Sequence, residues 1–126
     1  SMYSSTKATI TDTQIQALVR HAFGSGASAA SINAIDSGMM NAVFHLSLSG
    51  VSQDASEVLL KVSFPPGADV LTYEHDIMKA EIQFYRHLAD EALPIPVPRI
   101  LFCDFSHRLI VNDYFFMTKL SGMKRF

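Results

Sequence analysis

The strongest constraint on the fold is a long amphipathic stretch, residues 70–93, that leads directly into a proline-rich segment. Apolar side chains recur in this stretch at spacings of three and four, which is typical of a helix with one buried face. Pro94, Pro96 and Pro98 cannot continue that helix, because each proline fixes φ and lacks an N–H donor. The sequence therefore predicts one long helix followed by an extended segment.

Five shorter segments have the pattern of β-strands. Residues 30–36 and 42–50 alternate apolar and polar side chains, whereas residues 58–64, 99–105 and 114–120 are largely apolar. Short turns separate the first three segments, so we expect them to form an antiparallel meander. We expect a polar loop between the last two.

A further helix is predicted at the start of the chain. Residues 11–23 open with Thr11 or Asp12, both of which are common helix caps, and Gly24 and Gly26 follow the last apolar residue. The side chains that would share its buried face are Ile15, Leu18, Val19, Ala22 and Phe23.

These elements together predict an α+β fold. We expect a five-stranded, mainly antiparallel sheet with the long helix packed on it, preceded by the N-terminal helix. The chain has 126 residues, of which 48% are hydrophobic, and this suffices for the core of a single domain spanning residues 1–126.

Composition argues against several classes of function. The formal net charge is -2, so we expect no nucleic-acid partner. No apolar run approaches the roughly 18 residues of a membrane span, and we expect no membrane association and a cytoplasmic location. The single cysteine, Cys103, excludes an internal disulfide and is expected to be buried in its strand. No metal site is predicted, because the histidines lack the spacing of metal ligands. These are His21, His45, His75, His87 and His107.

One charged residue, Lys61, interrupts the apolar strand "VLLKVSF". Burying an ammonium is costly unless an anion compensates it, so Lys61 needs a carboxylate partner. Glu81 and Glu74 are both candidates, since they lie two turns apart on the same side of the long helix. Glu81 is favoured by its apolar neighbours. The alternative is that Lys61 lies at a sheet edge with its ammonium in water.

Four segments in order, "VLLKV", "EIQFYRHL", "PIPVPRILFCDF" and "YFFMTKLSG", resemble the N-terminal lobe of a known enzyme family. This is the aminoglycoside phosphotransferase and choline kinase-like family, whose members have a protein-kinase-like fold. The resemblance covers residues 33–122 and implies a kinase-like small lobe that binds ATP with Mg²⁺. The family transfers the γ-phosphoryl group to a hydroxyl of a small-molecule acceptor. Lys61 would reach the α- and β-phosphates and pair with Glu81.

The resemblance also implies two backbone elements around the nucleotide. The first is a loop above the triphosphate, whose N–H groups would face phosphate oxygens. It would be formed by Ser37, Gly38, Met39, Met40 and Asn41. The second is a hinge in which Met117 lines the back of the pocket, the Thr118 carbonyl accepts from the adenine amino group, and the Leu120 N–H donates to a ring nitrogen. Without the resemblance, Gly38 would be a turn glycine and Met117 a core residue.

The catalytic parts of the family do not occur in these residues. The H-G-D-x-x-x-x-N loop and the following Asp motif, which supply the catalytic Asp and the Mg²⁺ ligands, are absent from the 126 residues. We therefore expect a chain truncated before the C-terminal catalytic lobe, with no catalytic or metal-binding residue of its own. It should bind ATP weakly or not at all and should not turn over alone. The sequence does not identify the acceptor substrate, which could be an aminoglycoside, choline, homoserine, a sugar or a hydroxyacyl thioester.

Two other functions remain open. The chain could be a noncatalytic truncated homologue that acts as a protein-association module, or a small α+β binding protein unrelated to kinases. We also expect self-association as a homo-oligomer, most simply a twofold dimer, through apolar surface at residues 114–126 and at Met39 and Met40. Strand addition at a free sheet edge is a second route to pairing.

Overall fold

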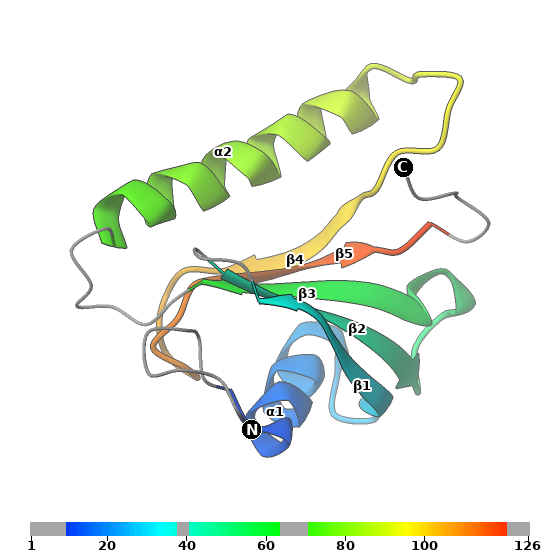
Figure 1. Ribbon diagram of the computed structural model, residues 1–126. Helices are drawn as coiled ribbons and strands as arrows, with labels where there is room; N and C mark the ends of the chain where they lie inside the picture. The colour runs from blue at the N-terminus through cyan, green and yellow to red at the C-terminus, as the bar shows by residue number, and fades with distance from the viewer. Residues whose placement is uncertain (1–9, 38–40, 64–70, 121–126) are drawn as a thin grey trace.

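The computed structural model describes residues 10–37, 41–63 and 71–120 and shows a sheet between two helices (Figure 1). The predicted helices and strands are confirmed, with small shifts at their ends. The elements are α1 (Asp12–Phe23), β1 (Ser28–Ser37), β2 (Asn41–Ser49), the 3₁₀ turn η1 (Gln53–Ala55), β3 (Glu57–Ser63), α2 (Leu71–Asp90), β4 (Ile100–Asp104) and β5 (Tyr114–Thr118).

The five strands form one antiparallel sheet in the order β1-β2-β3-β5-β4. The predicted α+β class is confirmed. Strand β3 lies in the centre, where Lys61 is directly opposite Val43 on β2 and Phe115 on β5. The alternative of an edge position for Lys61 is therefore wrong.

Helix α1 covers one face of the sheet and forms the larger core with it (Figure 1). Its start is a capping box, in which the Thr11 hydroxyl accepts a hydrogen bond from the Gln14 N–H at 3.1 Å and the Gln14 side chain accepts from the Thr11 N–H at 2.9 Å. Gln16 bonds both the N–H and the carbonyl of Ala29. The helix is thus attached to the first strand by polar as well as apolar contacts.

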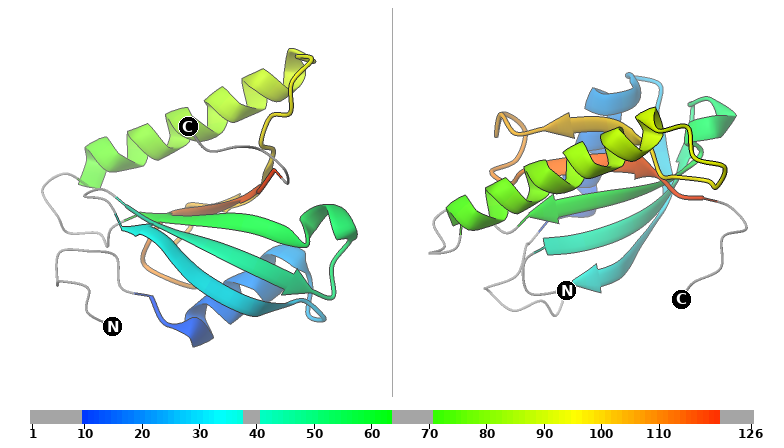
Figure 2. Two further views of the ribbon diagram at one scale, coloured as in Figure 1. Left: turned by 45° about the vertical axis from the view of Figure 1, so that its right-hand side comes forward. Right: turned by 90° about the horizontal axis from the view of Figure 1, so that it is seen from above.

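Helix α2 lies on the opposite face and forms a smaller core. Met78 and Ile82 of the helix pack against Phe115 and Met117 of β5. Seen from above, α2 passes over β4 and β5 but does not extend over β1 and β2 (Figure 2, right). The two helices therefore cover the sheet unequally, and α2 has the smaller apolar contact with it.

The loop before β5 is more than the polar connector that the sequence predicts. Ile110 is buried in the larger core, and Asn112 and Asp113 are also buried. The Asn112 side-chain amide donates to the Ser63 carbonyl at 2.7 Å, and the Asp113 N–H donates to the Ser63 hydroxyl at 2.9 Å. The prediction failed here because polar side chains that bond backbone groups at the end of β3 have the same composition as solvated ones.

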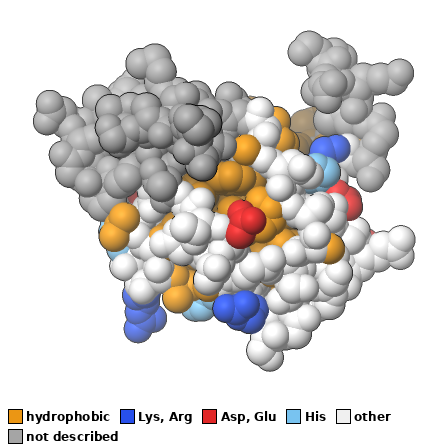
Figure 3. Space-filling view, turned by 60° about the horizontal axis from the view of Figure 1, so that its bottom comes forward, with side chains coloured by type: hydrophobic (Ala, Val, Ile, Leu, Met, Phe, Trp, Pro, Cys, Tyr) orange, Lys and Arg blue, Asp and Glu red, His pale blue; other side chains and the backbone are white. Residues whose placement is uncertain are grey.

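On the face drawn in Figure 3, the Lys and Arg side chains of the described residues lie apart from one another. Among the described residues, no helix has both the length and the hydropathy needed to cross a bilayer.

Candidate functional site

Lys61 and Glu81 form an ion pair between the central strand and α2. The Nζ atom of Lys61 lies 2.7 Å from Oε2 of Glu81, and the two side chains are 19% and 23% exposed. The prediction that Lys61 pairs with Glu81 is confirmed. The side chain of the rival, Glu74, lies outside the described residues.

The packing of α2 explains why Glu81 reaches Lys61. Met78 and Ile82 are buried against β5, and Glu81 lies beside them at the edge of the same helical face. One turn later is Tyr85, whose pKa is raised by burial and, to a smaller extent, by the negative charge of Glu81. The carboxylate is thus held at the boundary between the small core and the open part of the sheet.

An apolar surface adjoins the pair on the same face of the sheet. Leu59 precedes Lys61 by two residues, so both side chains point to the side of α2. Val43 is directly opposite Lys61, and Met117 is directly opposite Leu59, so they share this face. We call Val43, Leu59 and Met117 the apolar shelf. Met117 is buried, whereas Val43 and Leu59 are partly exposed.

Sequence reasoning missed Val43 and Leu59 as site residues. For Leu59 a signal was present, because strand periodicity places the residue two before Lys61 on the same face. Val43 had no comparable signal, since its position opposite Lys61 depends on the register between β2 and β3.

A polar cluster lies beyond the shelf, at the start of β3. His45 Nε2 is 2.5 Å from Glu57 Oε1, and the Ser47 hydroxyl donates to Glu57 Oε2 at 3.0 Å. The hydrogen bond from His45, followed by that from Ser47, lowers the pKa of Glu57. The face of the sheet beside α2 thus changes from a cation at Lys61 to apolar side chains and then to an acid.

The predicted phosphate loop is only partly within the described residues. Ser37 is the last residue of β1 and Asn41 the first of β2, so both belong to strands rather than to the turn itself. Nothing is described of their side chains, and Gly38, Met39 and Met40 lie outside the described residues. The loop therefore stays a prediction.

The predicted hinge residues lie at the end of β5, next to the shelf. Met117 is buried in the smaller core, as expected of a core residue, and it is also part of the apolar shelf. Thr118 is bonded to Arg99 through both its N–H and its hydroxyl, at 2.9 Å each. The Lys119 N–H donates to the Glu57 carbonyl, and Leu120 follows as a partly buried residue. Met117 thus lies on the face of the sheet where Leu59 lies, whereas Thr118 is directly opposite Val58, on the face of the larger core.

In the described part of the chain, no group of three or more His, Cys, Asp or Glu residues is arranged to hold a metal ion. Three of the histidines contact carboxylates instead. These pairs are His45–Glu57, His87–Glu91 and His107–Asp113. His21 packs its ring edge-on against Phe102.

The apolar residues of β5 that are expected to drive self-association are buried. Phe115 and Phe116 are 0% exposed and Met117 is 8% exposed, all within one chain. The expectation that the apolar side chains of β5 are exposed is therefore wrong. They are buried in the two cores that the sheet forms with α1 and α2. Met39, Met40 and Phe126 lie outside the described residues.

Comparison with protein-family models, curated proteins and solved structures found no significant match to this chain. A functional assignment therefore depends on the geometry of the site and on the resemblance of the four sequence segments.

Proposed function

We propose that this chain is the nucleotide-binding N-terminal lobe of an ATP-dependent small-molecule phosphotransferase of the aminoglycoside phosphotransferase and choline kinase-like family. The reaction would transfer the γ-phosphoryl group of ATP to a hydroxyl of the acceptor. The catalytic Asp and the Mg²⁺ ligands would come from residues other than these 126, so the chain alone is inactive.

The observation that carries the proposal is the Lys61–Glu81 pair. A lysine on a central strand, held by a glutamate of the adjacent helix, is the arrangement that positions a phosphate-binding lysine in kinases. A purely structural ion pair would have no need of an open surface next to it. Here the apolar shelf of Val43, Leu59 and Met117 adjoins the lysine and α2 does not extend over β2.

The order of elements supports the same proposal. The helix, three strands, long helix and two strands follow one another as in the small lobe of a kinase. The residues that resemble a hinge begin at the end of β5, the strand next to β3.

Each residue of the site has a definite task under this proposal. Lys61 supplies positive charge to the α- and β-phosphates, and Glu81 holds the ammonium in place. The shelf offers an apolar face to the adenine ring, and the backbone at Thr118 and Leu120 offers an acceptor and a donor at its edge. ATP with Mg²⁺ would contribute the phosphoryl group and the neutralisation of its charge.

A nucleotide titration of the 126-residue chain, followed by NMR, tests the proposal. We expect millimolar ATP to shift the backbone amides of Leu59, Met117 and Leu120. Lys61→Met should make ATP bind no better than adenosine, because the phosphates lose their cation. Arg20→Met, which removes a cation from an exposed position on α1, is the matched control and should bind ATP like the parent chain. Shifts confined to α1, or equal effects of the two variants, would refute the assignment.

The coding sequence beyond Phe126 gives an independent test. We expect it to encode an H-G-D-x-x-x-x-N loop followed by an Asp motif. A reading frame that closes without this loop would favour the noncatalytic association module. The burial of Phe115, Phe116 and Met117 weakens that alternative, because it removes the apolar surface on which the module was based. The proposal includes a cytoplasmic location, supported by a single cysteine that can form no internal disulfide.

A further inference from the structure

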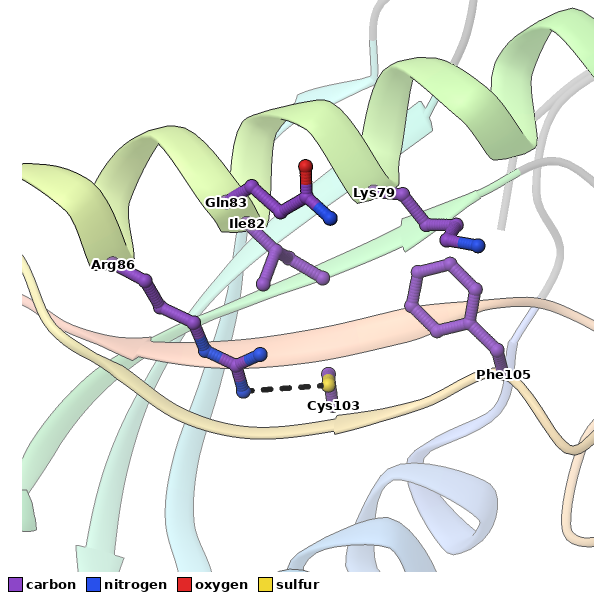
Figure 4. A pocket seen from close by; sticks show the side chains of 6 residues that line it. All are labelled: Lys79, Ile82, Gln83, Arg86, Cys103 and Phe105. Atoms are coloured by element: carbon purple, nitrogen blue, oxygen red, sulfur yellow. Dashed lines mark hydrogen bonds between the residues drawn. The ribbon is translucent and has the colours of Figure 1, made fainter.

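A cavity of about 240 Å³ lies between α2 and β4, separate from the Lys61–Glu81 pair (Figure 4). Four of its lining residues come from one face of α2, at spacings of three and four, and two come from β4 and the residue after it. The lining residues are Lys79, Ile82, Gln83, Arg86, Cys103 and Phe105.

The polar part of the cavity is cationic. Lys79 and Arg86 extend from α2 toward β4, and none of the described residues that line the space is a carboxylate (Figure 4). Within the described part of the chain, neither cation forms an ion pair with a carboxylate. The described acceptor for Arg86 is the Cys103 sulfur, 3.8 Å from Nη2. A thiol is a weak acceptor, and a guanidinium has five N–H donors, so Arg86 retains donors for a ligand.

The floor of the cavity is apolar. Ile82 is 4% exposed, and Cys103 and Phe105 are partly buried. The expectation that Cys103 is buried is therefore wrong, because its side chain points into this space beneath α2 rather than into a closed core. An apolar floor below two cations suits a ligand with a flat apolar body and one anionic group.

We propose that this cavity binds a small aromatic carboxylate. The carboxylate lies between Lys79 and Arg86, and the ring lies against Ile82 and Phe105. The volume sets the size of the ligand, because pockets for drug-sized molecules begin at about 300 Å³ and a single ring suits the smaller space. An inorganic anion would leave the floor uncovered, and a neutral ring would leave both cations without a partner.

The test uses the 126-residue chain with benzoate as the probe. Cys103 is the only cysteine, so its alkylation by iodoacetamide, read by mass spectrometry, reports on this cavity alone. We expect benzoate to slow the alkylation with a half-maximal concentration on the order of a millimolar, which is reasonable for a ligand of this size. Acetate, which lacks the ring, and benzamide, which lacks the charge, should each protect Cys103 much less at equal ionic strength.

Two variants locate the carboxylate. Arg86→Gln should weaken protection by benzoate about fivefold to tenfold, because a charge-assisted hydrogen bond is lost. Arg20→Gln removes the same charge from an exposed position on α1 and should leave protection unchanged. Because both side chains are exposed, both variants should fold, which their NMR spectra would verify. Equal protection by benzoate and benzamide, or equal weakening by the two variants, would overturn the proposal.

Discussion

The ammonium of Lys61 and the carboxylate of Glu81 meet at 2.7 Å across the boundary between the central strand and α2. About four-fifths of each side chain is removed from solvent, since 19% and 23% remain exposed. The pair adjoins the smaller core, which α2 forms with residues of β3, β4 and β5. It therefore attaches this helix to the sheet as well as orienting the lysine.

Removing one partner of the pair should destabilise the chain. We expect Glu81→Ala to lower the free energy of unfolding by about 1 to 3 kcal/mol, between the values for exposed and fully buried pairs. The double variant Lys61→Met/Glu81→Met should lose less stability than the two single variants Lys61→Met and Glu81→Met lose together, because it leaves no charge unpaired. Urea unfolding measures both. As a control, Glu91→Gln affects a pair with more exposed side chains and should change stability by less than about 0.5 kcal/mol.

The chain alone should bind ATP weakly. Its described residues contain no group arranged to hold a metal ion, and the Mg²⁺-binding motifs of the proposed family do not occur in these 126 residues. Calorimetry with ATP and Mg²⁺ should show no saturable heat at micromolar nucleotide. A micromolar, Mg²⁺-dependent affinity would contradict the view that another lobe completes the site.

Glu57 should make the stability of the chain depend on pH in the acid range. Hydrogen bonds from His45 and Ser47 lower its pKa in the folded state. The stabilisation is therefore present above about pH 4.3, the ordinary value for glutamate, and is lost as the pH falls through the lowered pKa. Because Glu57 is 41% exposed, Glu57→Gln should cost only about 0.2 to 1 kcal/mol at pH 7. It should cost less at pH 3. Urea unfolding measures how far Glu57→Gln lowers the free energy of unfolding at each pH. An equal loss at both pH values would show that the hydrogen bonds to the Glu57 carboxylate do not stabilise the fold in this way.

The loop before β5 should depend on Asn112. Asn112→Ala removes the hydrogen bond to the buried Ser63 carbonyl and should lower stability by about 1 to 3 kcal/mol. The neighbouring side chain of Val111 is 55% exposed, so Val111→Ala is the control and should be close to neutral. Thermal unfolding distinguishes the two, and similar losses would show that the loop is held by other contacts.

Self-association remains a prediction, but less apolar surface is exposed to drive it than the sequence predicts. Burial of Phe115, Phe116 and Met117 leaves partly buried Leu120 as the described apolar residue of the predicted surface. Sedimentation velocity at micromolar concentrations measures the outcome. A dimer that Leu120→Ser disrupts would support pairing through this end of the chain, and a monomer would show that the lobe closes its surface unaided.

The sequence alone determined the helices and strands and the need of Lys61 for a carboxylate partner. Periodicity located both helices and the first two strands, because a buried face imposes a spacing of 3.6 or 2 on apolar residues. Short, largely apolar runs located the other three strands. The prolines after residue 93 ended α2 for a local steric reason. An ammonium in an apolar strand needs a nearby carboxylate, and the apolar neighbours of Glu81, together with the family resemblance, favoured it over Glu74.

Tertiary structure decided what depends on register and packing. Val43 enters the site only because β2 pairs with β3 in one register, and a shift by one residue would turn it to the other face. The His45–Glu57 pair has the same origin, since its partners lie on different strands. Cys103 and Phe105 line a cavity because α2 crosses β4 at that point. These relationships join residues far apart in the chain, and no local pattern of side chains encodes the distance between them.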